Sequence, residues 1–384
     1  MSKYGILSKI LKVVSVLVSV LFITWLFLPV HIKNAFVYQY PGIEDWEIFD
    51  YRVVKASSDP APWPEAKHYN KTGLTKTLSD TLEYYKSVAF VIIRNDSILY
   101  EKYWEGYGRD SYSNSFSMAK SIVSLLIGIA IDEGKIGSVD DPVYKYLPYF
   151  KEGKNRELTI KDLLTMSSGS NWDEHNKKLN GFPTRSYYGD DLQGLAKEVK
   201  IINDPGKRFV YSSGNTELLG LIVSSATGKD LSSYASEKLW QPLGAEHDAL
   251  WSLDKKDGTE KAFCCFNSNA LNFARFGILL LDKGMAGGKR LISETYLNEA
   301  VSPASRLLDR DGRPVDFYGY QFWLLKHNGK YYPYMRGFFG QYVIVVPEKN
   351  AVIVRLGHQR SQSFSGYHPW DAVTYLQEGL KMLE

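Results

Sequence analysis

The distribution of hydrophobic positions separates an apolar N-terminus from a longer mixed remainder. Val13 to Val30 contains no charged side chain, and lysines at positions 3, 9 and 12 precede it. This stretch is long for a signal-peptide core and sufficient for a membrane span. It ends in Phe27-Leu28-Pro29-Val30 without a small-x-small cleavage site. We therefore predict an uncleaved signal anchor over residues 1–30, with a cleaved signal peptide as the alternative. The lysines predict a single-pass topology with the following domain outside the cytoplasm.

Strand-like patterns occupy the two ends of the remaining chain. Ser87 to Ile93 and Ile98 to Trp104 are β-branched and aromatic runs separated by Arg94-Asn95-Asp96-Ser97, which predicts a hairpin. Four similar runs follow near the C-terminus, at Tyr318 to Leu325, Lys330 to Met335, Gln341 to Val346 and Ala351 to Leu356. With helical patterns in between, this order predicts an α+β fold in which the first and last strands share one antiparallel sheet.

Helix-like patterns fill the middle of the chain and its end. The run that follows Ser117 is apolar nearly all round, as in a buried helix. Amphipathic segments are predicted at Leu158 to Met166, Thr216 to Ala226, Asn269 to Asp282 and Trp370 to Glu384. Residues 171–195 combine aromatic and acidic side chains without a clear period, and we predict that they wall a cleft. Residues 31–75 are predicted to form a linker or packing arm, and residues 76–384 the main domain.

Composition narrows the possible functions. A net charge of +3 over 384 residues, with no basic cluster interleaved with aromatic residues, argues against nucleic-acid binding. The seven histidines are scattered and lie in no metal-binding spacing, so no metal site is predicted. Cys264 and Cys265 are adjacent, and the ring closed by a vicinal disulfide is strained. We therefore expect two reduced cysteines that pack as small buried hydrophobic residues.

The strongest chemical signal is Ser117-Met118-Ala119-Lys120 at the start of the apolar helix. A serine hydroxyl becomes a good nucleophile when a neighbouring base takes its proton. Residues three apart lie on one helix face, and a helix start offers free N–H groups for a developing negative charge. The same spacing recurs at Ser252 and Lys255 in a polar stretch typical of a solvated turn. From the tetrapeptide alone, a helix cap at Ser117 remains the alternative to a nucleophile.

Two further segments could complete such a site. Phe209-Val210-Tyr211-Ser212-Ser213-Gly214-Asn215 places a tyrosine in a polar turn before a predicted helix. Arg336-Gly337-Phe338-Phe339-Gly340-Gln341 is a glycine-bearing approach to a predicted strand. Tyr211 could equally be one of many core aromatic residues.

With these three segments in this order, the chain resembles the serine β-lactamase and penicillin-binding-protein superfamily. The resemblance is to its class C-like branch, which includes carboxylesterases and 6-aminohexanoate-dimer hydrolases. It extends over roughly residues 80 to 380. Secondary signatures include Asp162-Leu163-Leu164-Thr165-Met166-Ser167-Ser168-Gly169 and Leu239-Trp240-Gln241-Pro242-Leu243-Gly244. The resemblance implies a β-lactamase-like fold, in which an antiparallel sheet is flanked by helices and an all-helical region is inserted.

The resemblance also implies roles for particular residues. Ser117 corresponds to the nucleophile and Lys120 to the base, whose pKa burial should depress. Tyr211 matches the family tyrosine that relays the proton to the leaving group and helps to activate water. The backbone N–H groups of Ser117 and Phe338 would form the oxyanion hole. No metal or organic cofactor is implied.

The chain departs from the β-lactamase pattern at two positions. Ser213 stands where β-lactamases have asparagine, and Met335-Arg336-Gly337 replaces Lys-Thr-Gly. Ser213, Arg336 and Gly337 would therefore contact the substrate in a different way, and efficient penicillin hydrolysis is not expected. These departures favour the hydrolysis of a small ester, amide or short peptide.

Three alternatives remain open at this level. One is a D,D-peptidase or β-lactamase that acts on cell-wall peptides or β-lactams. Another is a Ser-His-Asp hydrolase that uses His358, although the sequence contains no Gly-x-Ser-x-Gly motif. The third is a membrane-tethered binding module of the same fold without catalytic activity.

Overall fold

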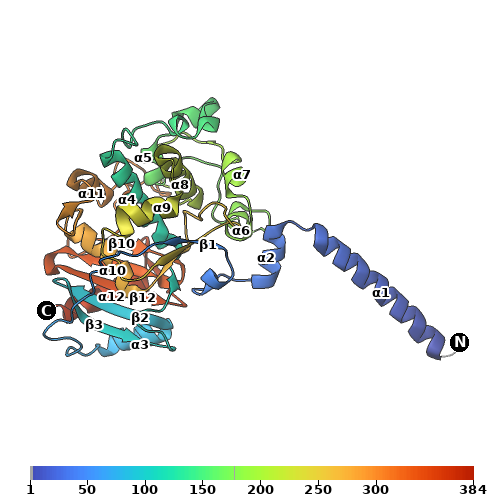
Figure 1. Cartoon of the computed structure of the whole chain (residues 1–384), viewed down its shortest axis with the longest axis horizontal. Coiled ribbons are helices and arrows are strands. Elements are labelled where there is room, and N and C mark those ends of the chain that lie inside the picture. Colours follow the sequence, from blue (N-terminus) through green and yellow to red (C-terminus); the bar gives the residue numbers. More distant parts are fainter. Residues whose placement is uncertain (1–2, 177) are drawn as a thin grey trace.

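The fold is built around a six-stranded antiparallel sheet, in a computed structural model that describes residues 3–176 and 178–384 (Figure 1). Its strand order is β3-β2-β12-β11-β10-β9. The strands are β2 (Ser87–Arg94), β3 (Ser97–Tyr103), β9 (Trp323–His327), β10 (Lys330–Arg336), β11 (Tyr342–Val346) and β12 (Ala351–Gly357). The predicted α+β class is confirmed, and β2 pairs with β12 as expected for first and last strands. The β2–β3 turn places Asn95 and Asp96 at positive φ, which suits these residues in a tight hairpin.

Helices cover both faces of this sheet. Val352 and Ile353 are neighbours in β12, so their side chains point to opposite faces. Helix α10 (Ala270–Leu281) packs Gly277 against Val352, whereas α12 (Trp370–Met382) packs Gly379 against Ile353. A Cβ at either glycine would collide with the facing strand residue, so both glycines permit close packing. Helix α3 (Lys76–Tyr84) lies beside α12 on the same face.

A helical region stands above the sheet in Figure 1. Its central helices are α4 (Ala119–Asp132) and α8 (Ser213–Thr227), which pack against each other. Every residue of α4 from Ala119 to Ala130 is buried, as the apolar pattern predicts. The other helices are α5 (Ile160–Leu164), α6 (Phe182–Tyr188), α7 (Leu192–Lys197), α9 (Leu231–Ala235) and α11 (Glu294–Ala300).

A second sheet joins distant parts of the chain. Its order is β1-β5-β6-β4, formed by β1 (Tyr51–Val54), β5 (Ala249–Ser252), β6 (Phe266–Ser268) and β4 (Ser113–Asn114). Strand β1 lies within residues 31–75, so this part of the N-terminal segment is hydrogen-bonded into the body of the protein. Two short hairpins complete the strands, β7 (Met285–Ala286) with β8 (Lys289–Arg290) and β13 (Phe364–Ser365) with β14 (His368–Pro369).

The N-terminal helix α1 (Lys3–Phe27) projects away from the body (Figure 1). Its segment Leu7–Phe27 is long and apolar enough to cross a membrane. The helix ends three residues earlier than the predicted apolar stretch, because Leu28 precedes Pro29 and a residue before proline disfavours helical geometry. A second helix, α2 (Val30–Tyr38), follows and packs against α6.

Candidate active site

The serine of the Ser-x-x-Lys segment lies where β4 turns into the central helix. Residues Phe116–Met118 form a single 3-10 turn that leads directly into α4. Phe116 has a φ of 44°, an unfavourable value for a large side chain, and Asn114 Oδ1 accepts its backbone N–H at 2.8 Å. Ser117 does not cap the helix, and its Oγ instead accepts a hydrogen bond from Lys120 Nζ at 3.1 Å. The structure thus joins the two side chains that the spacing predicts.

Lys120 is held in a dry environment by three oxygen atoms. Its side chain is 1% exposed, and its Nζ contacts Ser117 Oγ, Ser213 Oγ at 3.2 Å and the Phe263 carbonyl at 2.8 Å. Burial disfavours the charged ammonium and lowers the pKa of Lys120 to about 8, although Glu174 and Glu217 oppose this shift. A sizeable neutral fraction near neutral pH is what a lysine needs to accept a proton from a serine.

Tyr211 lies on the other side of the same pair. The Lys120 Nζ is 5.3 Å from the centre of its ring, and the ring packs against Trp323. Burial raises the pKa of Tyr211 to about 12, while a hydrogen bond with Ser117 and the charge of Arg336 act in the opposite direction. The phenol therefore stays protonated at neutral pH and can donate a hydrogen bond.

The end of strand β10 runs directly beside the segment that carries Ser117. A Cβ on Gly337 would collide with the backbone carbonyl of Ser115, so glycine allows this close approach. Phe338 begins a short 3-10 turn, and the first N–H groups of such a turn have no partner inside it. The backbone N–H of Ser117 likewise lies in the first residues of a 3-10 turn, Phe116–Met118, and has no partner inside that turn. Both predicted oxyanion-hole residues also line one cavity.

The cavity in front of Ser117 has a volume of about 520 Å³. Aromatic and other apolar side chains form most of its wall. The polar residues that line it are Gln39, Ser117, Glu174, Thr184, Ser186 and Ser213. Residues 171–195 contribute one side, as predicted, through Glu174, Pro183, Thr184, Ser186, Tyr187 and Tyr188. The position of Glu174 was not predicted from the sequence, and its carboxylate accepts the backbone N–H of Ser213. Its only signal was its place in an acidic and aromatic segment.

A protein-family model described as Beta-lactamase matches residues 75–374. The chain belongs to the β-lactamase family. This membership confirms the resemblance inferred from the motifs and the prediction of a β-lactamase-like hydrolase.

Relatives of this β-lactamase-family protein carry several names. The 6-aminohexanoate-dimer hydrolase of Paenarthrobacter ureafaciens is 27% identical over 296 residues, covering 73% of this chain and 74% of the relative. A putative D-alanyl-D-alanine carboxypeptidase of Escherichia coli is 31% identical over 197 residues, or 44% of each chain. A solved structure of a putative 6-aminohexanoate-dimer hydrolase from Bacillus anthracis superposes with a TM-score of 0.76 at 22% identity, covering 89% and 92%. A family VIII carboxylesterase superposes with a TM-score of 0.63 at 16% identity, covering 84% and 99%.

Ser213 and Arg336, the two residues that depart from the β-lactamase pattern, lie in different surroundings. Ser213 faces the cavity, and its Oγ accepts a hydrogen bond from Lys120. Arg336 instead stacks its guanidinium on the Trp323 ring, 3.2 Å from the ring centre, and donates to the Tyr367 carbonyl at 2.8 Å. These two contacts hold the side chain of Arg336, and Arg336 does not line the cavity.

The structure of the two adjacent cysteines in this β-lactamase-family chain differs from the sequence prediction. Cys264 and Cys265 form a disulfide, so the expectation of reduced thiols is wrong, whereas their burial is as expected. Cys265 adopts a φ of 66°, and side chains hold the local turn. Trp251 donates to the Cys264 carbonyl at 3.1 Å, and Asn267 donates to the Cys265 carbonyl at 2.9 Å. The surrounding fold thus fixes a turn in which neighbouring sulfurs meet, and Cys264 lines the Ser117 cavity.

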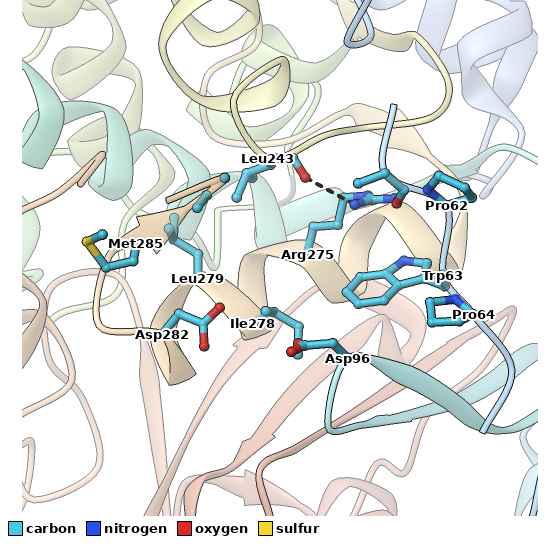
Figure 2. A pocket seen from close by; sticks show the side chains of 13 residues that line it. Pro62, Trp63, Pro64, Asp96, Leu243, Arg275, Ile278, Leu279, Asp282 and Met285 are labelled. Carbon is cyan, nitrogen blue, oxygen red and sulfur yellow. Dashed lines mark hydrogen bonds between the residues drawn. The ribbon is translucent and has the colours of Figure 1, made fainter. Parts of the chain in front are cut away.

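Two other candidates lie outside the β-lactamase-type site. A separate cavity of about 390 Å³ is lined by apolar side chains, two aspartates and Arg275 (Figure 2). Arg275 donates there to the Leu243 carbonyl, and none of the lining residues is a serine, cysteine, lysine or tyrosine. His358 lies 3.2 Å from a Glu105 carboxylate oxygen, and its ring packs edge-on to Tyr107. Neither arrangement supplies a nucleophile with an adjacent base.

Proposed function

We propose that the protein hydrolyses an ester or amide through an acyl-enzyme formed on Ser117. The observation that carries this proposal is the 3.1 Å contact between Ser117 Oγ and Lys120 Nζ, with the pKa of Lys120 lowered to about 8. A nucleophile beside a base that is partly neutral near pH 7 is the minimum requirement for serine acylation. The named hydrolases among its relatives support the same reaction class.

In the acylation step, neutral Lys120 accepts the hydroxyl proton while Ser117 Oγ attacks the substrate carbonyl carbon. The carbonyl oxygen becomes negatively charged and accepts hydrogen bonds from the N–H groups of Ser117 and Phe338. Each such donor typically contributes about 2.7–4 kcal/mol to transition-state stabilisation. The tetrahedral intermediate then expels the alcohol or amine, which takes up a proton relayed from Lys120 through Tyr211.

Deacylation reverses these roles with water as the nucleophile. Neutral Lys120 takes a proton from the attacking water through Tyr211, which passes its own hydroxyl proton to Lys120 and regains one from the water. The proton on Lys120 then returns to Ser117 Oγ as the carboxylic acid leaves. Tyr211 is suited to a relay because its hydroxyl forms a hydrogen bond with Ser117, while Lys120 Nζ lies over its ring, 5.3 Å from the ring centre.

The substrate class follows from the groups around Ser117. Because Arg336 is held by Trp323 and the Tyr367 carbonyl, it is poorly placed to bind the carboxylate of a β-lactam. We therefore favour a small ester, amide or short peptide, with Ser213, Gly337 and the Phe338 backbone at the substrate. We also propose the signal-anchor topology, with residues 1–30 in the membrane and the hydrolase domain, residues 76–384, on the extracytoplasmic side.

A fluorescent fluorophosphonate should label the full-length protein at Ser117 and nowhere else. The reason is that this probe reacts with a serine whose proton a neighbouring base removes. Mass spectrometry of the labelled peptide identifies the site, and Ser117→Ala should abolish labelling. Intact, folded protein that takes up no label would reject the hydrolase and favour a binding module of the same fold.

The rate of this labelling should rise with pH and reach a plateau above about pH 8. Lys120 acts as a base only when neutral, and its pKa is lowered to about 8. Below that value the neutral fraction, and hence the rate, falls about tenfold per pH unit. The measurement is the second-order labelling rate between about pH 5 and pH 10. Tyr211, with a pKa of about 12, stays protonated over this range.

Lys261 provides a matched control because burial lowers its pKa to about 8 as well. It is fully buried, and its Nζ has no hydrogen-bond partner among the residues that the structure describes. Lys261→Met should therefore leave the inflection near pH 8 in place. If the inflection disappears in this variant, Lys120 is not the group that controls the rate.

A further inference from the structure

The membrane-span candidate is attached to the wall of the Ser117 cavity. Helix α1 ends at Phe27 and α2 begins at Val30, and Lys33 Nζ donates back to the Leu26 carbonyl at 3.0 Å. Helix α2 then packs on α6, one side of the cavity, and lies beside it in Figure 1. Asn34 donates to the Tyr188 carbonyl at 2.9 Å, and the rings of Tyr38 and Tyr188 stack. The end of α1 is therefore fixed near the cavity by a short and well-connected segment.

The residues that follow α2 form part of the cavity itself. Gln39, Tyr40 and Pro41 line it, and Tyr40 is 82% exposed. In contrast, Phe116 and Phe263 line the same cavity and are buried. The connector thus belongs to the exposed rim, and the buried aromatic residues form the floor near Ser117. The mouth of the cavity opens beside the segment that leaves the membrane-span candidate.

Apolar side chains on α2 face solvent next to this mouth. Phe36 is 59% exposed and Val37 is 58% exposed, and neither lines the cavity. The 21 residues of Leu7–Phe27 extend over roughly 30 Å, the thickness of a bilayer core. With that segment in a bilayer, the start of α2 is at the membrane surface, where aromatic residues such as Tyr40 are favoured. A lipid surface is the occupant that accounts for the exposed Phe36 and Val37.

The cavity has polar groups at Ser117 and a mixed wall towards α2, where Gln39, Thr184 and Ser186 stand beside aromatic side chains. Glu174 accepts the backbone N–H of Ser213, whose Oγ lies 3.2 Å from Lys120 Nζ, so these polar groups gather at the nucleophile. Tyr187 and Tyr188 are buried residues of α6, which packs against α2, and Pro41 follows α2 in the chain. An ester group at Ser117 would therefore have its hydrocarbon chain among aromatic side chains that lead towards the membrane surface.

We propose that the Ser117 cavity is loaded from the membrane surface and hydrolyses amphiphilic esters or amides with a long acyl chain. The inference rests on the hydrolase and the anchored topology proposed above. Ser117 Oγ forms a bond to the acyl carbon, the ester bond to the alcohol breaks, and the alcohol leaves with a proton. Water then releases the fatty acid and regenerates the serine hydroxyl. The membrane supplies the substrate and keeps it at high local concentration beside the mouth.

The test uses full-length protein in phosphatidylcholine vesicles and two substrates with the same leaving group. Methylumbelliferyl palmitate resides in the bilayer, whereas methylumbelliferyl acetate is water-soluble. The double variant Phe36→Ser/Val37→Ser should hydrolyse the palmitate at least about tenfold more slowly and the acetate at the wild-type rate. Tyr84→Ser is the matched control, because Tyr84 is an exposed aromatic residue on α3, remote from α2 in Figure 1. It should leave both rates unchanged.

The outcomes separate the two levels of the proposal. Hydrolysis of the acetate with no hydrolysis of the palmitate, or equal palmitate rates for wild type and the double variant, would overturn membrane loading and leave the hydrolase intact. Mass spectrometry that finds α1 removed from the mature protein would overturn it as well. If neither ester is hydrolysed and Ser117 takes up no fluorophosphonate, the hydrolase itself is rejected.

Discussion

Ser117→Ala and Lys120→Met are each expected to lower kcat for ester hydrolysis by about 10⁴-fold or more, and the double variant to lose little beyond either single one. The first removes the proposed nucleophile. The second removes the base that lies 3.1 Å from it, and Tyr211 cannot replace that base because its pKa is raised to about 12. A 10⁴-fold loss corresponds to about 5 kcal/mol of transition-state stabilisation. Because the two side chains act in one step, their losses should not add.

Methionine is chosen at position 120 because it keeps most of the buried volume of the lysine stem. Thermal unfolding of each variant should show that the fold is retained. Lys255→Ala is the matched control, since Lys255 completes the second Ser-x-x-Lys pattern but is exposed in a turn after β5. Its kcat should equal that of wild type. Loss of activity in this variant, or activity retained in Ser117→Ala, would show that the reaction uses a different nucleophile.

These two patterns illustrate what the sequence can and cannot predict. Ser117 and Ser252 share the same spacing to lysine, but only Ser117 precedes a long apolar run, and that context predicts the buried helix that joins serine to lysine. The second pattern falls at the end of a strand, where residues three apart do not share a face. Local periodicity was therefore enough to find the Ser117–Lys120 pair.

The large sheet was predictable for a similar reason, and the small sheet was not. Strands β2, β3, β11 and β12 are five to eight residues long and are rich in β-branched or aromatic residues. Strands β4 and β6 have two and three residues, too few for a period to be recognised. This sheet also joins distant parts of the chain, since β4 pairs with β6 and β1 pairs with β5. Such pairing depends on the tertiary fold and leaves no local signal.

Some features of the site depend on packing that a sequence does not encode locally. The direction of Arg336 is set by Trp323 and the Tyr367 carbonyl, which come from other parts of the chain. Local strain argues against a Cys264–Cys265 disulfide, but Trp251 and Asn267 hold the turn in which it forms. Glu174 reaches Ser213 across a loop without a helical or strand period. These positions follow from the assembled fold.

Tyr211→Phe should lower kcat by about 10²–10⁴-fold while leaving the fold intact. The change removes one hydroxyl and keeps the ring that packs against Trp323. Without the phenol, the proton that Lys120 takes from Ser117 has no relay to the leaving group, and the attacking water loses a hydrogen-bond partner. Both acylation and deacylation should therefore slow, which single-turnover and steady-state measurements on one ester can separate.

Tyr318→Phe is the matched control for this prediction. Tyr318 is a buried tyrosine whose ring packs edge-on to that of Tyr211, 6.4 Å between ring centres, so its substitution removes a hydroxyl from the same aromatic cluster. Its pKa lies well above the ordinary value because of burial, so it is also protonated at neutral pH. If Tyr318→Phe leaves kcat within about twofold of wild type and Tyr211→Phe does not, the effect belongs to the relay rather than to packing. Near-normal turnover by Tyr211→Phe would remove the tyrosine from the mechanism and leave Lys120 to serve both proton transfers.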